Sequence, residues 1–159
     1  MSATSFAVPN TERYFEDYVP GSVFEYGTIL VEEAEVIEYA KRFDPQDIHT
    51  DAAASARGPY NGLIASGWHT AGMMMRLLAD NFISKVASLG SPGVDELRWI
   101  LPVRPGDTLR IRVTVLDARR SRSKPDRGIV GSMTEVLNQK GEVVMSVKAM
   151  MLFRCRKTS

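Results

Sequence analysis

The sequence predicts a single α+β domain in which an antiparallel sheet wraps around one long central helix. Residues 63–83 place apolar side chains on nearly every face of a helix, which is typical of a helix that a sheet surrounds. Residues 107–116 alternate apolar and polar side chains, as a strand with one buried face does. The β-favouring segments 128–137 and 142–153 are separated by the short hairpin connection 138–141. Strands that follow one another through short turns pair in an antiparallel sheet.

Local signals predict the remaining elements. Residues 22–31 follow a Pro-Gly turn and alternate loosely in β-favouring residues, and residues 95–101 supply another strand. Residues 32–43 place apolar side chains at helical spacing, with acids in the first turn and basic residues in the last. Asp44 precedes Pro45, which disfavours the α conformation at position 44. We therefore expect this helix to end at Asp44.

Length and composition are those of one globular domain. The 159 residues are 44% hydrophobic and 25% charged, with a formal net charge of +1. We expect residues 1–13 to be a flexible N-terminal lead-in and residues 14–159 to form the domain. The nearly neutral charge argues against nucleic acid or an anionic membrane as a partner. A single cysteine, and the lack of a signal-like apolar run in residues 1–10, favour a cytoplasmic protein.

The segment 43–51, Phe-Asp-Pro-Gln-Asp-Ile-His-Thr-Asp, is the strongest candidate for a catalytic loop. It holds Asp44 and His49, the latter one of 2 histidines, between two predicted helices that can fix their positions. Imidazole titrates near neutral pH and suits general acid–base work. The competing interpretation is an Asx-turn at Asp44 with a surface histidine, because Asp-Pro pairs are frequent in turns.

This segment resembles the Asp-x-Asn-Pro-x-His loop of the MaoC-like dehydratases and (R)-specific enoyl-CoA hydratases, which have a hot-dog fold. The pattern continues with Gly67 near the start of the long helix and with the Pro-Val-x-Pro-Gly-Asp turn at 102–107. The resemblance covers residues 15–153. Gln46 and Asp47 stand where the family usually has Asn-Pro.

The resemblance implies a hydro-lyase that adds water reversibly to a trans-2-enoyl-CoA thioester. It also implies that Asp44 and His49 form a catalytic dyad and that the Gly67 amide contributes to the oxyanion hole. We expect His49 to take a proton from the water, and Asp44 to orient the water or the imidazole and to carry a proton to the α-carbon. The helix dipole and burial are expected to raise the pKa of Asp44 and favour its neutral form. No feature calls for a metal or redox cofactor.

Further candidates for substrate binding lie on the long helix. Ser66 and Trp68 flank Gly67. His69 follows Ser66 by three residues on the same helix face, where it either lines the pocket or is a buried core histidine. Met75 belongs to a methionine run that suits either core packing or a tunnel for an acyl chain.

A basic segment between two predicted strands contains Arg122, Lys124 and Arg127. These side chains are candidates for binding the phosphates of coenzyme A, and a solvated hairpin tip is the alternative. A sheet with one helix leaves an edge uncovered, so we expect a homodimer or a higher homo-oligomer. The basic segment of one chain is then able to serve the site of the other.

Two other functions are compatible with this sequence. A thioesterase on the same kind of fold would use a carboxylate and a water to attack the thioester carbon, releasing a free thiol. A non-catalytic acyl-CoA-binding subunit would hold the ligand without turning it over, which the altered Gln46-Asp47 step allows.

Overall fold

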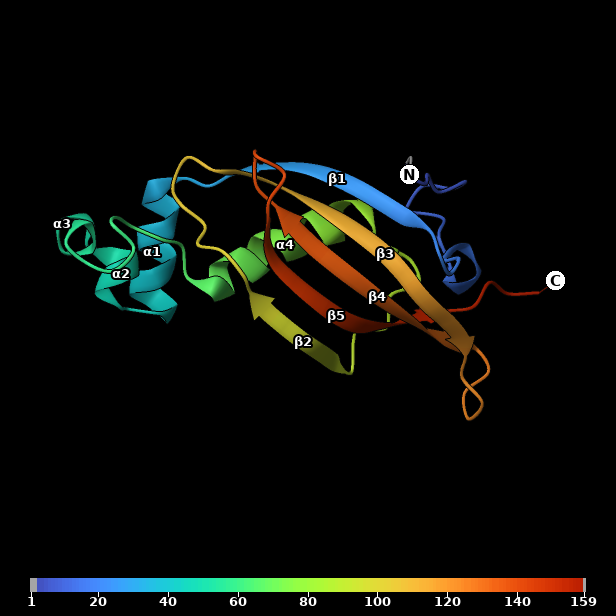
Figure 1. The fold of residues 1–159 in the computed structure, drawn as a ribbon. Helices are drawn as coiled ribbons and strands as arrows, with labels where there is room; N and C mark the ends of the chain where they lie inside the picture. The colour runs from blue at the N-terminus through green and yellow to red at the C-terminus, as the bar shows by residue number, and fades with distance from the viewer. Residues whose placement is uncertain (1–2, 159) are drawn as a thin grey trace.

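A five-stranded antiparallel sheet and one long helix form the body of the molecule in the computed structural model, which describes residues 3–158 (Figure 1). The sheet order is β1-β3-β4-β5-β2, and every neighbouring pair is antiparallel. The strands are β1 (Val23–Leu30), β2 (Gly93–Trp99), β3 (Thr108–Arg120), β4 (Arg127–Leu137) and β5 (Val143–Arg154). The helices are η1 (Phe15–Asp17), α1 (Glu33–Phe43), α2 (Asp47–Thr50), α3 (Ala52–Ala56) and α4 (Gly67–Asn81). The predicted α+β domain, with a sheet around one long helix, is confirmed.

The long helix α4 is buried along one face only. Its buried residues recur in pairs about one helical turn apart, as an amphipathic helix requires; they are His69, Thr70, Met73, Met74, Leu77 and Leu78. Trp68 and Met75 on the other face are 59% and 46% exposed. The expectation of a helix buried on nearly every face is therefore wrong, because the sheet of one chain covers α4 from one side. The alternation predicted for β3 is present, with Leu109, Ile111, Val113 and Val115 all buried.

Helix α4 also begins four residues later than the sequence pattern predicts. The residues before Gly67 make hydrogen bonds to distant segments instead of to their own helix. The Ile64 amide donates to the Ile48 carbonyl at 3.1 Å, and the Ala65 amide donates to the Val103 carbonyl at 2.7 Å. The helix start at Gly67 leaves the amides of its first turn without intrahelical acceptors.

Part of the expected lead-in packs against the domain. The Phe6 ring stacks on Phe24 with centroids 4.1 Å apart. Arg13 is 5% exposed and donates to the carbonyl oxygens of Asn81 and Phe82 at 2.8 and 2.9 Å. These contacts hold Phe6 and Arg13 against the domain, and the flexibility of the lead-in stays a prediction. Residues 1–2 lie outside the described residues, and the domain boundary at residue 14 stays a prediction.

The helices α1, α2 and α3 gather at one end of the molecule, beside the start of α4 (Figure 1). The turn between β3 and β4 and both chain ends lie at the opposite end (Figure 1). Within the described residues, no helix is both long enough and apolar enough to span a membrane.

Candidate active site

Helix α1 ends at Phe43, and Asp44, the next residue, lines a pocket. Asp44 is the C-terminal cap of α1, with φ −153° and ψ 66°, and its amide still donates to the Ala40 carbonyl at 2.8 Å. Pro45 prevents a continued helix, as expected. The chain then makes the single helical turn α2, where the sequence suggested only an irregular loop. This turn carries His49 back toward Asp44.

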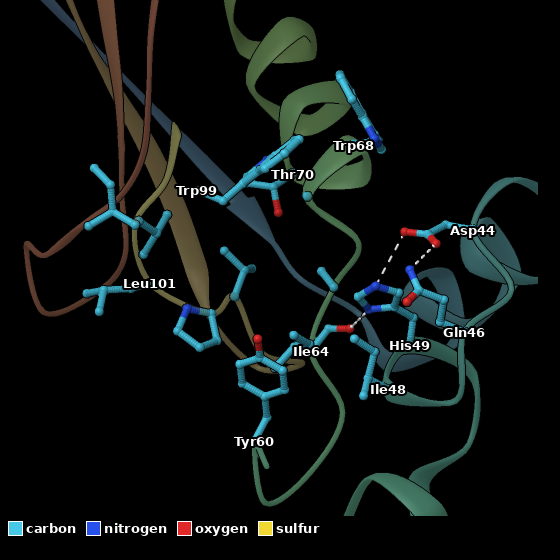
Figure 2. Close-up of a pocket in the computed structure, with 16 residues that line it drawn as sticks. Asp44, Gln46, Ile48, His49, Tyr60, Ile64, Trp68, Thr70, Trp99 and Leu101 are labelled. Carbon is cyan, nitrogen blue, oxygen red and sulfur yellow. Dashed lines mark hydrogen bonds and ion pairs between the residues drawn. The ribbon is translucent and has the colours of Figure 1, made fainter. Parts of the chain in front are cut away.

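Asp44 and His49 face each other across a short gap (Figure 2). The distance from His49 Nε2 to Asp44 Oδ2 is 3.3 Å, and the two side chains are 6% and 21% exposed. On the other side of the ring, His49 Nδ1 lies 2.7 Å from the Ile64 carbonyl oxygen. A carbonyl oxygen can only accept, so Nδ1 carries the hydrogen and Nε2 is the nitrogen available for proton exchange. The interpretation of His49 as a surface residue is therefore wrong.

Two neutral donors hold the Asp44 carboxylate. Gln46 Nε2 donates to Oδ1 at 2.6 Å, and Ser66 Oγ donates to Oδ2 at 2.7 Å. The hydrogen bond from Gln46 and then that from Ser66 lower the pKa of Asp44 below its ordinary value; burial opposes them, and the nearby His49 adds to the lowering. The expected rise in this pKa is contradicted, because hydrogen bonds to the charged form outweigh a modest desolvation. Asp44 is thus a carboxylate at neutral pH.

Gly67 is the first residue of α4, and its place is tightly packed. A Cβ at this position would collide with the indole ring of Trp99. The close packing of Trp99 therefore requires a glycine at position 67. The missing side chain also leaves the N-terminus of α4 open. The Trp68 and Trp99 rings meet edge to face, with centroids 5.0 Å apart.

These groups line one pocket of about 410 Å³ (Figure 2). Its polar wall holds Asp44, Gln46 and His49, and the start of α4 contributes Gly67, Trp68 and Thr70. The opposite wall is largely apolar and comes from the end of β2 and the segment after it, with Trp99, Ile100, Leu101, Pro102 and Val103. Such a site joins a proton-exchanging pair to an apolar surface with a helix N-terminus between them.

Some predicted site residues lie elsewhere. His69 does not line this pocket; its Nε2 lies 3.0 Å from Glu35 Oε1. Met75 lines a separate apolar pocket of about 260 Å³ on the other half of α4. The structure therefore brings together Asp44, His49, Ser66, Gly67 and Trp68, and separates His69 and Met75 from them.

The basic segment is also remote from the pocket within one chain. Arg122 and Lys124 lie in the turn between β3 and β4, and Arg127 begins β4, at the end of the sheet opposite α1–α3 (Figure 1). Arg127 is paired with Asp126 at 2.9 Å. A role for these cations at the pocket of the same chain is not supported.

Two residues that line the pocket, Gln46 and Trp99, are not among the site residues that the sequence predicts. Gln46 counted only as a departure from a family pattern, although its place two residues after Asp44 was a signal for a local hydrogen bond. Trp99 carries no local signal, because its contact with Gly67 joins segments distant in the sequence. Among residues 3–158, no group of three or more His, Cys, Asp or Glu side chains is arranged to hold a metal ion.

The chain matches the MaoC like domain over residues 10–137 and belongs to this family. It is 31% identical over 157 residues to the mesaconyl-CoA hydratase of Cereibacter sphaeroides, covering 94% of this chain but only 43% of that protein. The structure resembles that of the MaoC-like dehydratase from Rhodospirillum rubrum, with a TM-score of 0.83 and 38% identity over 92% of this chain and 99% of the other. The (R)-hydratase PhaJ1 from Pseudomonas aeruginosa shares the fold, with a TM-score of 0.69 at 21% identity and 92% of each chain covered. The family thus includes hydro-lyases, and its fold is the hot-dog fold.

Proposed function

We propose that this protein adds water reversibly to the double bond of a trans-2-enoyl-CoA thioester, with Asp44 and His49 as the catalytic pair. The observation that carries the proposal is the 3.3 Å contact between His49 Nε2 and Asp44 Oδ2 in the wall of a pocket that also reaches the N-terminus of α4. Membership of a family that includes hydratases supports the reaction class.

His49 is the proposed proton carrier. The Ile64 carbonyl holds the hydrogen on Nδ1, so Nε2 of neutral His49 accepts a proton from a water molecule as its oxygen bonds to the β-carbon. The π electrons move to the α-carbon and the thioester oxygen. The imidazolium then returns the proton to the α-carbon, which completes the addition with the proton balance closed.

Asp44 serves this cycle as a carboxylate rather than as the initial acid. Gln46 and Ser66 keep it ionised, so it can orient the water and stabilise the imidazolium that forms on His49. The amide of Gly67, in the first turn of α4, is the proposed donor to the developing thioester oxyanion. Trp68 and the apolar wall opposite are the proposed contacts for the acyl and pantetheine portions.

We further propose that the protein works as a homodimer, joined through the free edge of β2. Several large apolar side chains at or after this strand are exposed: Val94 57%, Trp99 47%, Ile100 51% and Leu101 40%. An antiparallel pairing of two β2 edges would bring the basic β3–β4 turn of the second chain to the end that holds the pocket. Arg122 and Lys124 of that chain are the proposed partners for the phosphates of coenzyme A.

Crotonyl-CoA and longer trans-2-enoyl-CoAs test the reaction. We expect the conjugated enoyl absorbance to fall without release of free thiol, and Asp44→Asn to abolish most of this loss. Asp47→Asn is the matched control, because Asp47 lies in the same segment with an exposed side chain. Thiol release would instead identify a thioesterase, and no turnover of any enoyl-CoA would refute the hydratase proposal.

Binding can be followed separately from turnover. Both tryptophans of the chain, Trp68 and Trp99, line the pocket, so intrinsic fluorescence reports its occupation directly. Quenching by acyl-CoA without any chemistry would identify a non-catalytic binding subunit.

A further inference from the structure

A second contact between a histidine and an acid, in which only the histidine is buried, lies outside the pocket. His69, in the first turn of α4, is 5% exposed, and its Nε2 lies 3.0 Å from Oε1 of Glu35 on α1. The imidazole stacks on the Tyr39 ring, with centroids 4.7 Å apart and an interplanar angle of 11°. Among residues 3–158, His69 Nδ1 has no hydrogen-bond partner. The proposed chemistry uses none of these groups.

These contacts connect the two elements that build the pocket. Glu35, Tyr39 and Phe43 succeed one another at intervals of four residues along one face of α1, and the Tyr39 and Phe43 rings are 5.3 Å apart. This face ends directly before Asp44. On α4, Gly67 precedes His69 by two residues in the same turn. One contact thus ties the helix that ends at Asp44 to the turn that begins at Gly67.

Packing and stability alone explain this contact poorly. Burying a polar imidazole has a desolvation cost, and an apolar residue would fill the same space without that cost. The Glu35 side chain is 58% exposed, and hydrogen-bonded ion pairs with an exposed partner contribute little to stability. The value of the contact therefore lies in the geometry that it fixes.

We propose that His69 and Glu35 are positioning residues that hold α1 against the first turn of α4. This proposal rests on the hydratase function proposed above. The pair sets where the Asp44 carboxylate lies relative to Ser66, at 2.7 Å, and relative to His49, at 3.3 Å. Neither residue lines the pocket, so neither contacts the substrate there.

Kinetics of three variants test the proposal. We expect Glu35→Ala and His69→Phe to lower kcat about 10- to 100-fold, the effect of a displacement near 1 Å at a reacting centre, while KM changes little. His69→Phe keeps a ring against Tyr39 but removes the donor. Glu35→Gln keeps the acceptor and should restore kcat to near the wild-type value. The matched control is Glu33→Ala, an exposed acid in the same turn of α1 whose side chain makes no ion pair or hydrogen bond within residues 3–158.

The imidazole NMR spectrum reports the same geometry without turnover. The chain has 2 histidines, so the ring-proton signals of His49 and His69 can be assigned from the His69→Phe variant. We expect Glu35→Ala to shift the His49 signals, because Asp44 moves relative to the ring, and Glu33→Ala to leave them in place. If wild-type protein hydrates no enoyl-CoA but these shifts occur, the positioning role stands and the proposed function fails.

Three outcomes would overturn the positioning role. In the first, Glu35→Ala lowers the unfolding midpoint but leaves kcat and the His49 signals unchanged, which would identify a contact that serves packing only. In the second, Glu35→Gln is as impaired as Glu35→Ala. In the third, KM rises while kcat is kept, which would identify a binding role.

Discussion

The two histidines of this protein occupy similar surroundings but differ in how many hydrogen-bond partners their rings and the neighbouring acids have. Each is 5% exposed and each has a ring nitrogen near a carboxylate oxygen, at 3.3 Å for His49 and 3.0 Å for His69. His49 Nδ1 has a hydrogen-bond partner, its Nε2 lies beside Asp44 Oδ2, and the Asp44 carboxylate is held by two further donors. Nδ1 of His69 has no partner within residues 3–158, and its acid is largely exposed.

This difference indicates what each region does. The surroundings of His49 fix its tautomer and the charge of its acid, which is what a proton-transferring pair needs. The surroundings of His69 fix only where two helices meet. We therefore interpret the His49 region as the chemical centre and the His69 region as its support.

The largest expected effect on kcat comes from changing the Asp44–His49 pair. His49→Ala should lower kcat about 10²- to 10⁴-fold, or roughly 3 to 5 kcal/mol of barrier, because it removes the proton carrier. Steady-state kinetics with an enoyl-CoA measures this, and His69→Phe should cost less in the same assay. Equal losses in the two variants would remove the distinction between the two regions.

Gly67→Ala tests the packing of the first residue of α4 against Trp99. The added methyl group meets Trp99, so we expect unfolding free energy to fall by roughly 1 to 3 kcal/mol. Gly72→Ala is the control in the same helix, because its Cβ would find no heavy atom within 4 Å, and it should stabilise the protein by up to about 1 kcal/mol. Urea denaturation measures the unfolding free energy of both variants. Equal stability of the two would show that the Trp99 ring moves aside at no cost.

Ser66→Ala tests how the acid of the central pair is held. Losing one donor to a carboxylate should lower kcat about tenfold and raise the pKa of Asp44 toward its ordinary value. Gln46→Leu should raise it further, since Gln46 makes the larger contribution. Carboxyl NMR titration measures both shifts.

The same titration has a consequence for stability. Because folding lowers the pKa of Asp44, its contribution to stability is present above the pKa of the unfolded chain and is lost as pH falls through the folded value. Both variants should therefore lose less stability on acidification than the wild type does. An unchanged Asp44 titration in Ser66→Ala would contradict the assigned cause.

The smallest expected effect is at the far end of the sheet. The paired substitution Arg122→Ser and Lys124→Ser should raise KM for a CoA substrate roughly two- to fivefold, the range of exposed ion pairs, with kcat unchanged. The effect should vanish at high salt. If KM at low salt equals that of the wild type, these residues form a solvated turn that does not bind coenzyme A.

Patterns local in sequence predicted much of this molecule. Alternation in β3, the Asp-Pro stop after α1 and the spacing of Asp44 and His49 each depend on nearby residues, and the structure contains all three features. The start of α4 was misplaced because the amides of Ile64 and Ala65 bond to distant carbonyls. The pKa of Asp44 was predicted in the wrong direction because its donors, one of them Ser66 on another element, were not visible in the local pattern.

A double-variant experiment tests most directly whether Asp44 and His49 act as one unit. The rate constant kcat is measured for Asp44→Asn, for His49→Ala and for the protein with both changes, using one enoyl-CoA substrate. Residues that act together are not additive, so we predict that the double variant is about as slow as the slower single variant. A loss equal to the product of the two single losses would show that the residues act independently and would contradict the proposed catalytic pair.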